Sequence, residues 1–268
     1  DFFIREATLI ENVNHDMVVA CTYSKKAKGR SAGTDGIFLA MVNPQGEVVK
    51  YKNGYYEFPL AELEKFESAR NKRRMERKDD YEAPNLKVKN IITESDGSIL
   101  LTCEEDYIII HRNMNSGMGG MGMSGMTTTT YYTYHYEDIV AVKINAMGEY
   151  EWLRKIPKKQ SGVRGEGSMS FKLINDSTGY YFLYLDNIKN MELTENEVPK
   201  EYRDGTKGQV VVSKIDNKGT LTKELILDTK EEEIKIFPTA FRRINGNQFI
   251  GRATLQKNLY KPLLITVN

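Results

Sequence analysis

Several residue types and patterns that commonly signal function are scarce or missing in this sequence. Its 268 residues include two cysteines, three histidines and one tryptophan. Lysine and arginine together number 38 against 37 aspartates and glutamates, which gives a formal net charge of +1. Because a protein that binds duplex nucleic acid needs an excess of cations to displace counterions, this balance argues against a nucleic-acid partner. The longest apolar runs, such as residues 107–110, fall far short of the roughly 18 residues that a membrane-spanning helix requires, so we expect no membrane span.

Recognisable catalytic and metal-binding motifs are also missing. The three histidines belong to no H-x-x-x-H, H-E-x-x-H or Cys/His cluster, so the sequence predicts neither a zinc site nor a cofactor. Neither G-x-S-x-G nor G-x-x-x-x-G-K-S/T occurs. Glu104, Glu105 and Asp106 are adjacent carboxylates in a strand-like run, and adjacency gives no sign of the opposed pair that glycoside hydrolysis needs. A non-catalytic protein is therefore favoured over an enzyme.

The two cysteines, Cys21 and Cys103, are too few for a disulfide framework and form no C-x-x-C pair. Each lies in an apolar, strand-like run, where a thiol usually acts as a small buried hydrophobic group. We predict that both remain unpaired and occupy equivalent second strands of successive repeats.

A turn that occurs three times is the strongest internal signal. Each copy has an apolar strand, then Asn or Asp, two turn residues and Gly, then a second strand; the copies span residues 41–49, 143–150 and 214–221. The Asn or Asp side chain starts such a turn, and Gly supplies the positive φ that closes the hairpin. Two further strand-like runs precede each copy. Four strands per repeat are typical of a β-propeller blade.

We therefore predict an all-β fold of the β-propeller type, with four-stranded antiparallel blades and one helical insertion. The blades are expected at about residues 7–58, 86–160, 168–230 and 236–268. Once insertions at 59–80, 111–135 and 187–207 are left out of the count, the distance along the chain between successive copies of the turn approaches the roughly 40–50 residues of a blade. Residues 2–6 are interpreted as the last strand of another blade. Two alternatives remain open: residues 1–268 form one domain that these residues close into a ring, or they form part of a larger ring.

The insertion at residues 59–80 has the pattern of a helix. A proline suits its first turn, and Leu60, Leu63 and Phe66 share one face at helical spacing. We expect these three side chains to pack on the outside of the sheets. The basic residues at 70–78 are interpreted as a solvated helix end, with an acidic partner or an anionic membrane surface as the alternative.

Five of the 11 methionines fall in the segment at residues 111–135, among glycines and threonines: Met114, Met118, Met121, Met123 and Met126. Thioethers are soft ligands, and together with His111 and His135 they could hold Cu(I). The alternatives are a plain structural loop and a loop that contacts a partner. The sequence favours these alternatives, and we predict no metal.

If this segment contacts a partner, we expect the tyrosines at its end to make the contact: Tyr131, Tyr132, Tyr134 and Tyr136. Tyrosine offers a large amphipathic contact area with little rotamer entropy to lose. Strand alternation predicts that Tyr132, Tyr134 and Tyr136 lie on one face and Tyr131 on the other.

Several segments resemble a family of uncharacterised Bacteroidota proteins. They are residues 3–6, 56–60, 138–144, 152–160 and 180–187. Members of that family are longer at the N-terminus, carry export signals and are similar to β-propellers. The resemblance implies an exported cell-envelope protein, in the periplasm, at the outer membrane or outside the cell, of which this chain is the C-terminal part. It implies no catalytic residues, and the methionines depart from the family's Ser/Thr/Tyr-rich loop, which disfavours copper.

Two classes of function follow. The favoured hypothesis is a non-catalytic binding or scaffold module of the bacterial cell envelope, which holds a protein or glycan partner with the propeller face and its inserted loops. The alternative is a hydrolase that acts on extracellular polysaccharide or peptide. The second hypothesis requires carboxylates from different blades to converge.

Overall fold

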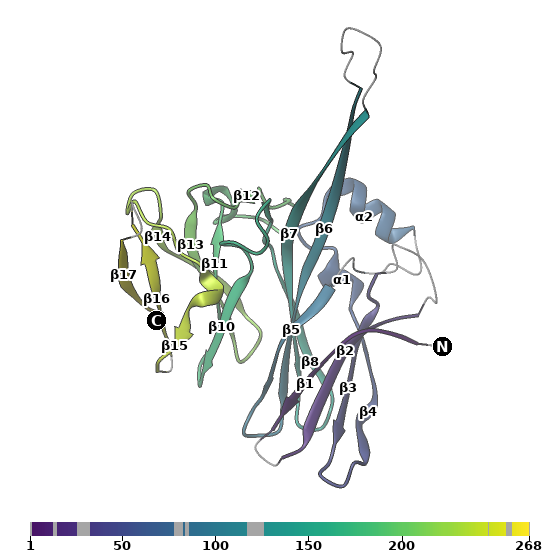
Figure 1. Cartoon of the computed structure of the whole chain (residues 1–268). Helices are drawn as coiled ribbons and strands as arrows, with labels where there is room; N and C mark the ends of the chain where they lie inside the picture. The colour runs from purple at the N-terminus through teal and green to yellow at the C-terminus, as the bar shows by residue number, and fades with distance from the viewer. Residues whose placement is uncertain are drawn as a thin grey trace.

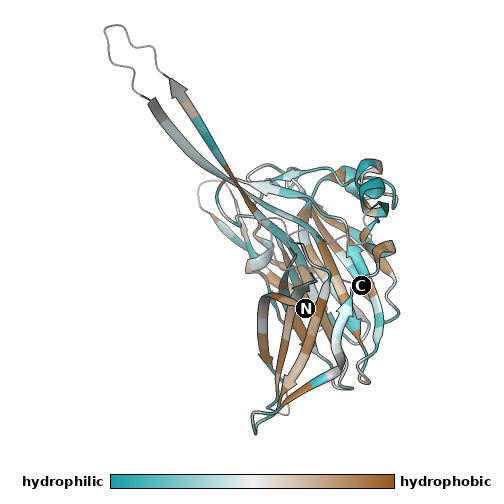
Figure 2. Ribbon diagram, turned by 90° about the vertical axis from the view of Figure 1, so that its right-hand side faces the viewer, coloured by the Kyte–Doolittle hydropathy of each residue, from teal (hydrophilic) through white to brown (hydrophobic). Residues whose placement is uncertain are grey.

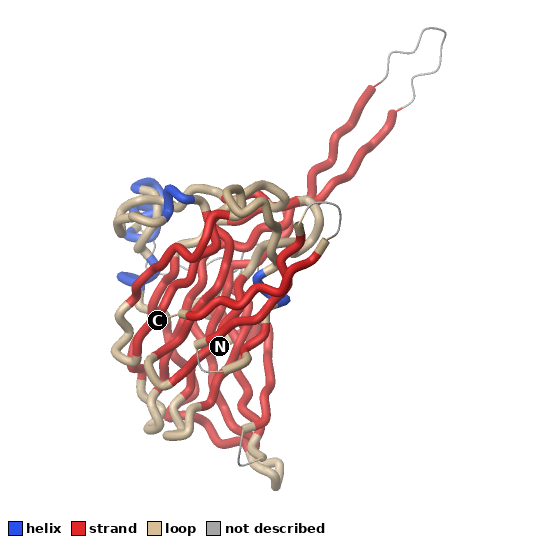
Figure 3. Tube along the Cα trace, turned by 90° about the vertical axis from the view of Figure 1, so that its left-hand side faces the viewer, coloured by secondary structure: helices blue, strands red, loops and turns tan. Residues whose placement is uncertain are grey.

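The computed structural model describes residues 2–12, 15–25, 33–77, 83, 86–116, 126–245, 247–255 and 259–267. Strand accounts for 58% and helix for 8% of the structure, which confirms the all-β prediction (Figure 3). Four sheets follow one another across the molecule in chain order (Figure 1).

Each sheet is built from strands that are close together in the sequence. The first sheet contains β1 (Phe3–Glu11), β2 (Met17–Ser24), β3 (Gly36–Val42) and β4 (Val48–Glu57). The second contains β5 (Leu86–Thr93), β6 (Ile99–Ser116), β7 (Met126–Ile144) and β8 (Tyr150–Ile156), with the short strands β9 (Gln160–Gly162) and β12 (Tyr202–Arg203) beside β7. The third contains β10 (Phe171–Asp176), β11 (Gly179–Asp186), β13 (Gln209–Asp216) and β14 (Leu221–Asp228). The fourth contains β15 (Arg242–Arg243), β16 (Gln248–Thr254) and β17 (Tyr260–Thr266).

The repeated turn closes the last hairpin of each of the first three sheets. In each copy the Asn or Asp side chain accepts a hydrogen bond from the backbone N–H four residues on, at 2.8 Å for Asn43, 2.8 Å for Asn145 and 2.7 Å for Asp216. The glycine just before that N–H has a positive φ of 83°, 72° or 81°. The local chemistry that the sequence indicates is therefore the chemistry that forms the turns.

Three apolar cores lie between successive sheets. Their central residues include Ile37 and Leu101 in the first core, Trp152 and Phe182 in the second, and Leu183 and Phe249 in the third. All eight residues of β11 are buried, because its two faces serve different cores. The outward faces of the first and fourth sheets instead carry exposed apolar side chains, among them Leu9, Met17, Ile250 and Leu264.

A buried ion pair joins the second sheet to the third. Lys158 Nζ lies 2.8 Å from Glu104 Oε1, and neither side chain has any exposed surface. Ser170, just before β10, donates its hydroxyl to the other oxygen of Glu104 at 2.6 Å. Lys158 also donates to the Tyr136 carbonyl and to Gln160 Oε1, at 2.9 and 3.0 Å. Both side chains therefore have several polar partners, which offset the cost of burying them away from water.

Residues 2–6 do not form a separate strand, and their assignment to another blade is wrong. β1 runs from Phe3 to Glu11 and pairs with β2 along its length. A bulge between Ile4 and Glu6 shifts the register there. Such a bulge bends a strand without ending it.

The helical insertion consists of two short helices, α1 (Leu60–Leu63) and α2 (Ala69–Glu76). The continuous helix that the sequence predicts is interrupted because Phe66 adopts a φ of +63°, which lies outside the α-helical region. Ser68 then caps α2 by accepting the Asn71 backbone N–H at 3.2 Å. Of the three expected anchors, Leu63 is buried in the first core, whereas Leu60 is 38% exposed and Phe66 lies in the break between the helices.

The extent of several strands and the direction of one strand pairing also differ from the sequence prediction. Residues 111–116 and 126–135, predicted as an inserted loop, continue β6 and β7; residues 117–125 lie outside the described part. The strand expected at 239–244 is reduced to β15, because the single-turn helix η2 (Pro238–Ala240) precedes it. Among the described strands one pairing is parallel, between β12 and β9 over two residues. A further single-turn helix, η1 (Ile188–Asn190), follows β11.

One expectation about a single feature is met. Cys21 on β2 and Cys103 on β6 are buried on the second strands of their sheets, and no disulfide joins them. None of the helices that the described residues form is long and apolar enough to cross a membrane.

Candidate functional site

Two strands of the second sheet extend far beyond their neighbours. β6 and β7 pair continuously from Tyr107 with His135 to Ser116 with Met126. This hairpin, called the arm below (residues 107–116 and 126–135), projects from the body (Figure 1, Figure 2). β5 pairs with β6 only as far as Glu105, and β9 pairs with β7 no further out than Tyr134. Beyond these points neither outer edge of the arm has a strand partner within the described residues.

The register sorts the arm's side chains onto two faces. Ile108 lies opposite Tyr134, and Ile110 lies opposite Tyr132, so these four share what we call the Ile–Tyr face. Ile108, Ile110 and Tyr132 are 51%, 54% and 46% exposed. Arg112 is the one residue of the arm with a full formal charge. By the same register Arg112, opposite Thr130, follows Ile110 on this face. A mainly aromatic and aliphatic surface that also carries an arginine is typical of a protein–protein interface.

The opposite face carries two stacked pairs of rings, and Ile109 and Tyr131 on it are 40% and 43% exposed. The His111 and Tyr131 rings stack at 4.4 Å, and the Tyr107 and His135 rings stack at 4.7 Å. His111 Nε2 also lies 2.9 Å from the Thr133 hydroxyl. These rings already have partners within the hairpin, so this face offers less free apolar surface than the Ile–Tyr face.

The four tyrosines expected at a partner contact are not equivalent. Tyr132 and Tyr134 lie on the Ile–Tyr face, and Tyr131 lies on the other, as the alternation predicts. Tyr136 shares the side of Tyr132 and Tyr134 but is only 8% exposed. Lys89 Nζ lies 5.3 Å from the Tyr136 ring centroid. Tyr136 therefore packs in the body of the protein, and Tyr132 and Tyr134 are the tyrosines placed for contact on this face.

The residues considered for copper are only partly described. Met114 is 72% exposed on the arm; Met118, Met121 and Met123, and the Met126 side chain, lie outside the description. Within the described ranges, no three His, Cys, Asp or Glu side chains are placed to share a metal ion.

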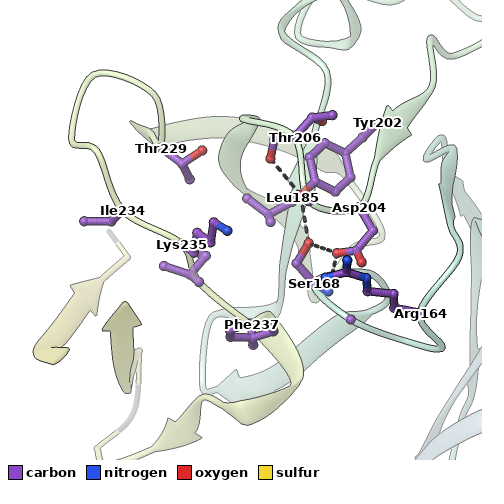
Figure 4. A pocket seen from close by; sticks show the side chains of 13 residues that line it. Arg164, Ser168, Leu185, Tyr202, Asp204, Thr206, Thr229, Ile234, Lys235 and Phe237 are labelled. Atoms are coloured by element: carbon purple, nitrogen blue, oxygen red, sulfur yellow. Dashed lines mark hydrogen bonds between the residues drawn. The ribbon is translucent and has the colours of Figure 1, made fainter. Parts of the chain in front are cut away.

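A second candidate site is a cavity of about 290 Å³ between the third and fourth sheets (Figure 4). One wall comes from the loop after β9, with Arg164 and Ser168, and from Tyr202 and Asp204 at β12. The facing wall comes from the segment between β14 and β15, with Ile234, Lys235 and Phe237. Leu185 at the end of β11 contributes to the apolar lining.

Hydrogen bonds hold the polar wall of this cavity in place. Asp204 Oδ1 accepts both the backbone N–H of Ser168 at 2.9 Å and its hydroxyl at 2.6 Å. The Tyr202 and Ser168 hydroxyls lie 2.8 Å apart. Burial raises the pKa of Tyr202 to about 12, so the phenol is neutral at physiological pH. The wall therefore presents a fixed carboxylate beside neutral hydroxyls.

Two glycines allow the loop after β9 to approach Asp204 this closely. A Cβ at Gly162 would lie 2.7 Å from the Cβ of Asp204. Gly167 has a φ of +55°, and a Cβ there would collide with the Asp204 carboxylate. Any other residue at these positions would displace Asp204 or the loop.

A third group of charged residues lies beneath the two helices. Lys155 Nζ is 2.9 Å from both Glu67 Oε1 and Asp138 Oδ2, and Glu105 lines the same cavity. The pKa of Glu105 is raised to about 9, mainly by burial and to a smaller extent by repulsion from Asp138 and Glu137. This carboxyl is therefore protonated at neutral pH. The cavity measures about 20 Å³, room for about one water molecule. A polysaccharide or peptide has no space beside these carboxylates.

Comparison with known proteins finds no family model, curated protein or solved structure that matches this chain. The candidate sites are therefore defined by geometry. Sequence reasoning missed the cavity, because Arg164, Asp204 and Lys235 are far apart in the chain. The glycines at 162–167 and the Asp-Gly-Thr at 204–206 could have indicated two tight loops, although not that the loops meet.

Proposed function

We propose that the protein is a non-catalytic binding module of the bacterial cell envelope that holds a protein partner on the Ile–Tyr face of the arm. The observation that carries this proposal is the exposure of Ile108, Ile110 and Tyr132 on a nearly uncharged hairpin whose edges have no partner among the described strands. The envelope location rests on the sequence resemblance.

The physical argument is that such a hairpin is costly to leave in water. A two-stranded ribbon is only marginally stable alone, and an exposed edge with few charges is a template for pairing with another chain. A partner segment that adds as a strand to β6 or β7 would satisfy the edge groups, and its side chains would cover the isoleucines. The apolar character of the face favours a protein over a glycan, which needs more polar groups to recognise its hydroxyls.

We further propose that the four sheets are blades of a β-propeller. Support comes from their chain order, from the antiparallel hairpins that make up most of each sheet, and from the apolar core between each neighbouring pair. The exposed outward faces of the first and fourth sheets then become the faces that adjoining blades would cover. An experimental structure of the full protein tests this directly, and a closed sandwich or barrel would contradict it.

Tyr131 and Tyr132 provide a matched test of the arm. They are adjacent and similarly exposed, at 43% and 46%, but lie on opposite faces. Affinity capture from envelope extract with the wild-type chain identifies a retained polypeptide by mass spectrometry, and binding is then measured with that polypeptide purified. Tyr132→Ser should weaken binding at least about tenfold, as expected for a central aromatic anchor, while Tyr131→Ser should change it little. Equal effects of the two substitutions would contradict the proposal, as would capture of no specific polypeptide.

A hydrolase of extracellular polysaccharide or peptide is the second candidate. One observation favours it: Glu67, Glu105 and Asp138 come from different elements and meet around Lys155, with Glu105 protonated as a general acid would be. The small size of that cavity weighs against it. If purified protein releases sugar or peptide fragments from envelope polymers, and Glu105→Gln abolishes that release, the hydrolase replaces the binding module as the favoured function.

A further inference from the structure

The cavity between the third and fourth sheets combines opposite charges with an apolar lining. We propose that it binds a small carboxylate with an apolar body the size of one amino-acid residue and an N–H beside the carboxylate. A free apolar amino acid and the C-terminal residue of a peptide both carry this chemistry. The inference concerns a site separate from the arm and does not depend on the arm's role.

Two cations are placed to receive the carboxylate. Arg164 and Lys235 come from opposite walls of the cavity (Figure 4). In the described part of the chain neither forms an ion pair, and both side chains are exposed. Arginine binds carboxylates through two parallel N–H donors, which gives such a contact direction as well as strength. The charged residues of the lining are Arg164, Lys235 and Asp204. Two cations and one carboxylate leave an excess of one positive charge, which one ligand carboxylate would balance.

Asp204 is placed to receive the ligand's N–H. Its Oδ1 already accepts two hydrogen bonds from Ser168. Its Oδ2 has no hydrogen-bond donor among the described residues. A fixed carboxylate with one open oxygen suits an ammonium or amide N–H. The same arrangement disfavours phosphate, because Asp204 already occupies the Ser168 backbone N–H and would repel a second anion.

The remaining lining suits an apolar side chain. Leu185, Ile234 and Ile236 are buried in it, and Phe237 is 41% exposed at its edge. The volume of about 290 Å³ lies at the lower end of the roughly 300–1,000 Å³ typical of small-molecule sites. A single apolar residue is therefore the size of ligand that fits.

Calorimetric titration of the full chain tests the ligand chemistry. The probes are leucine, N-acetyl-leucine and leucinamide, with a tetrapeptide ending in leucine as its free acid and as its amide. We expect the carboxylates to bind and the amides to bind at least about tenfold more weakly, since the amides lack the charge that Arg164 and Lys235 receive. Tighter binding of leucine assigns the site to free amino acids, and tighter binding of the free-acid peptide assigns it to C-termini.

Matched variants test the cavity itself. Arg164→Gln should weaken carboxylate binding at least about tenfold, whereas Arg70→Gln, an exposed arginine on α2 outside this cavity, should leave it unchanged. Circular dichroism confirms that both variants are folded. The proposal is overturned if no carboxylate binds at about 10 mM, if the amides bind equally well, or if the two variants behave alike. Tyr132→Ser should not affect these titrations, so failure of this site and failure of the arm remain distinguishable.

Discussion

Replacing Lys158 by methionine removes one half of the buried ion pair between the second and third sheets. Neither Lys158 nor Glu104 has exposed side-chain surface, and their charged atoms lie 2.8 Å apart. The Lys158 amine also donates to the Tyr136 carbonyl and to Gln160. Methionine is also long and unbranched, and its flexible thioether adapts to irregular space. The substitution therefore tests the charge and its hydrogen bonds more than the packing.

The expected loss of stability is large, because Glu104 loses its main partner while it stays fully buried. Breaking a buried pair by removing one partner costs about 3–5 kcal/mol. Ser170 at 2.6 Å and Lys89 at 3.4 Å still contact Glu104 and keep the cost from rising further. At about 2–4 °C per kcal/mol for a chain of this size class, the Tm should fall by roughly 6–20 °C.

Urea and thermal unfolding followed by circular dichroism measure this loss. The double variant Lys158→Met with Glu104→Gln should recover a large part of it, since no charge is then left buried alone. The exposed Lys189→Met serves as the control and should stay within about 0.5 kcal/mol of wild type. A loss below about 1 kcal/mol for Lys158→Met, or a double variant as unstable as the two single losses added, would refute the reasoning.

Four further outcomes are expected. Folding raises the pKa of Glu105 from 4.5 to about 9. The contribution of Glu105 to the free energy of unfolding is therefore complete at low pH and is lost as the pH rises toward 9. Urea unfolding at pH 6 and pH 9 should therefore show a loss of stability in wild type that Glu105→Gln reduces. Gly219→Ala should destabilise more than Gly46→Ala in the same assay. Both glycines have a φ near +80°, where a side chain costs about 1–2 kcal/mol. A Cβ at Gly219 would also lie 2.9 Å from the Trp152 ring, whereas the space around Gly46 is open. The two cysteine thiols should react with a thiol reagent after denaturation and only slowly in the native protein, where both are buried; zero reactive thiols after denaturation would contradict this. Replacing residues 113–130 by an Asn-Gly turn should change the Tm by less than about 3 °C, because none of the described residues among them belongs to the three cores. A larger fall would show that the fold depends on the arm.

The features that the sequence predicts well are local ones. The turn at Asn43 could be predicted because its side chain and the following glycine form the turn within five residues. β5 falls at residues 86–93 as expected, since Leu86, Val88 and Ile91 face the first core, with a bulge after Val88 that shifts the alternation by one residue. The break at Phe66 could not be predicted, because a helical pattern continues through it and nothing local marks the positive φ. The prediction of a loop was wrong for residues 111–116 and 126–135. It gave more weight to the glycines and methionines of the segment than to the strand-forming threonines and tyrosines at its end.

The candidate sites depend on contacts that no local pattern reveals. The alternation of Tyr131 and Tyr132 could be predicted from strand geometry, but the burial of Tyr136 depends on where the body ends and the arm begins. The cavity depends on two loops that meet only when the third and fourth sheets pack together. Arg164 and Lys235 therefore look like ordinary surface cations in the sequence.

The arm's attachment gives it mechanical properties that a loop would lack. β6 and β7 are continuous strands of 18 and 19 residues, and the parts of them that lie in the body are held between two apolar cores. A pull along the arm is shared by two strands anchored side by side, and many interstrand hydrogen bonds must break together before either strand slides. The bulge between Glu104 and Asp106 lies within the body, where β5 pairs with Glu105 and β9 pairs with Tyr136, and it bends the strands before they leave the body. The arm is thus anchored against tension, and the body sets the direction in which it presents a bound partner.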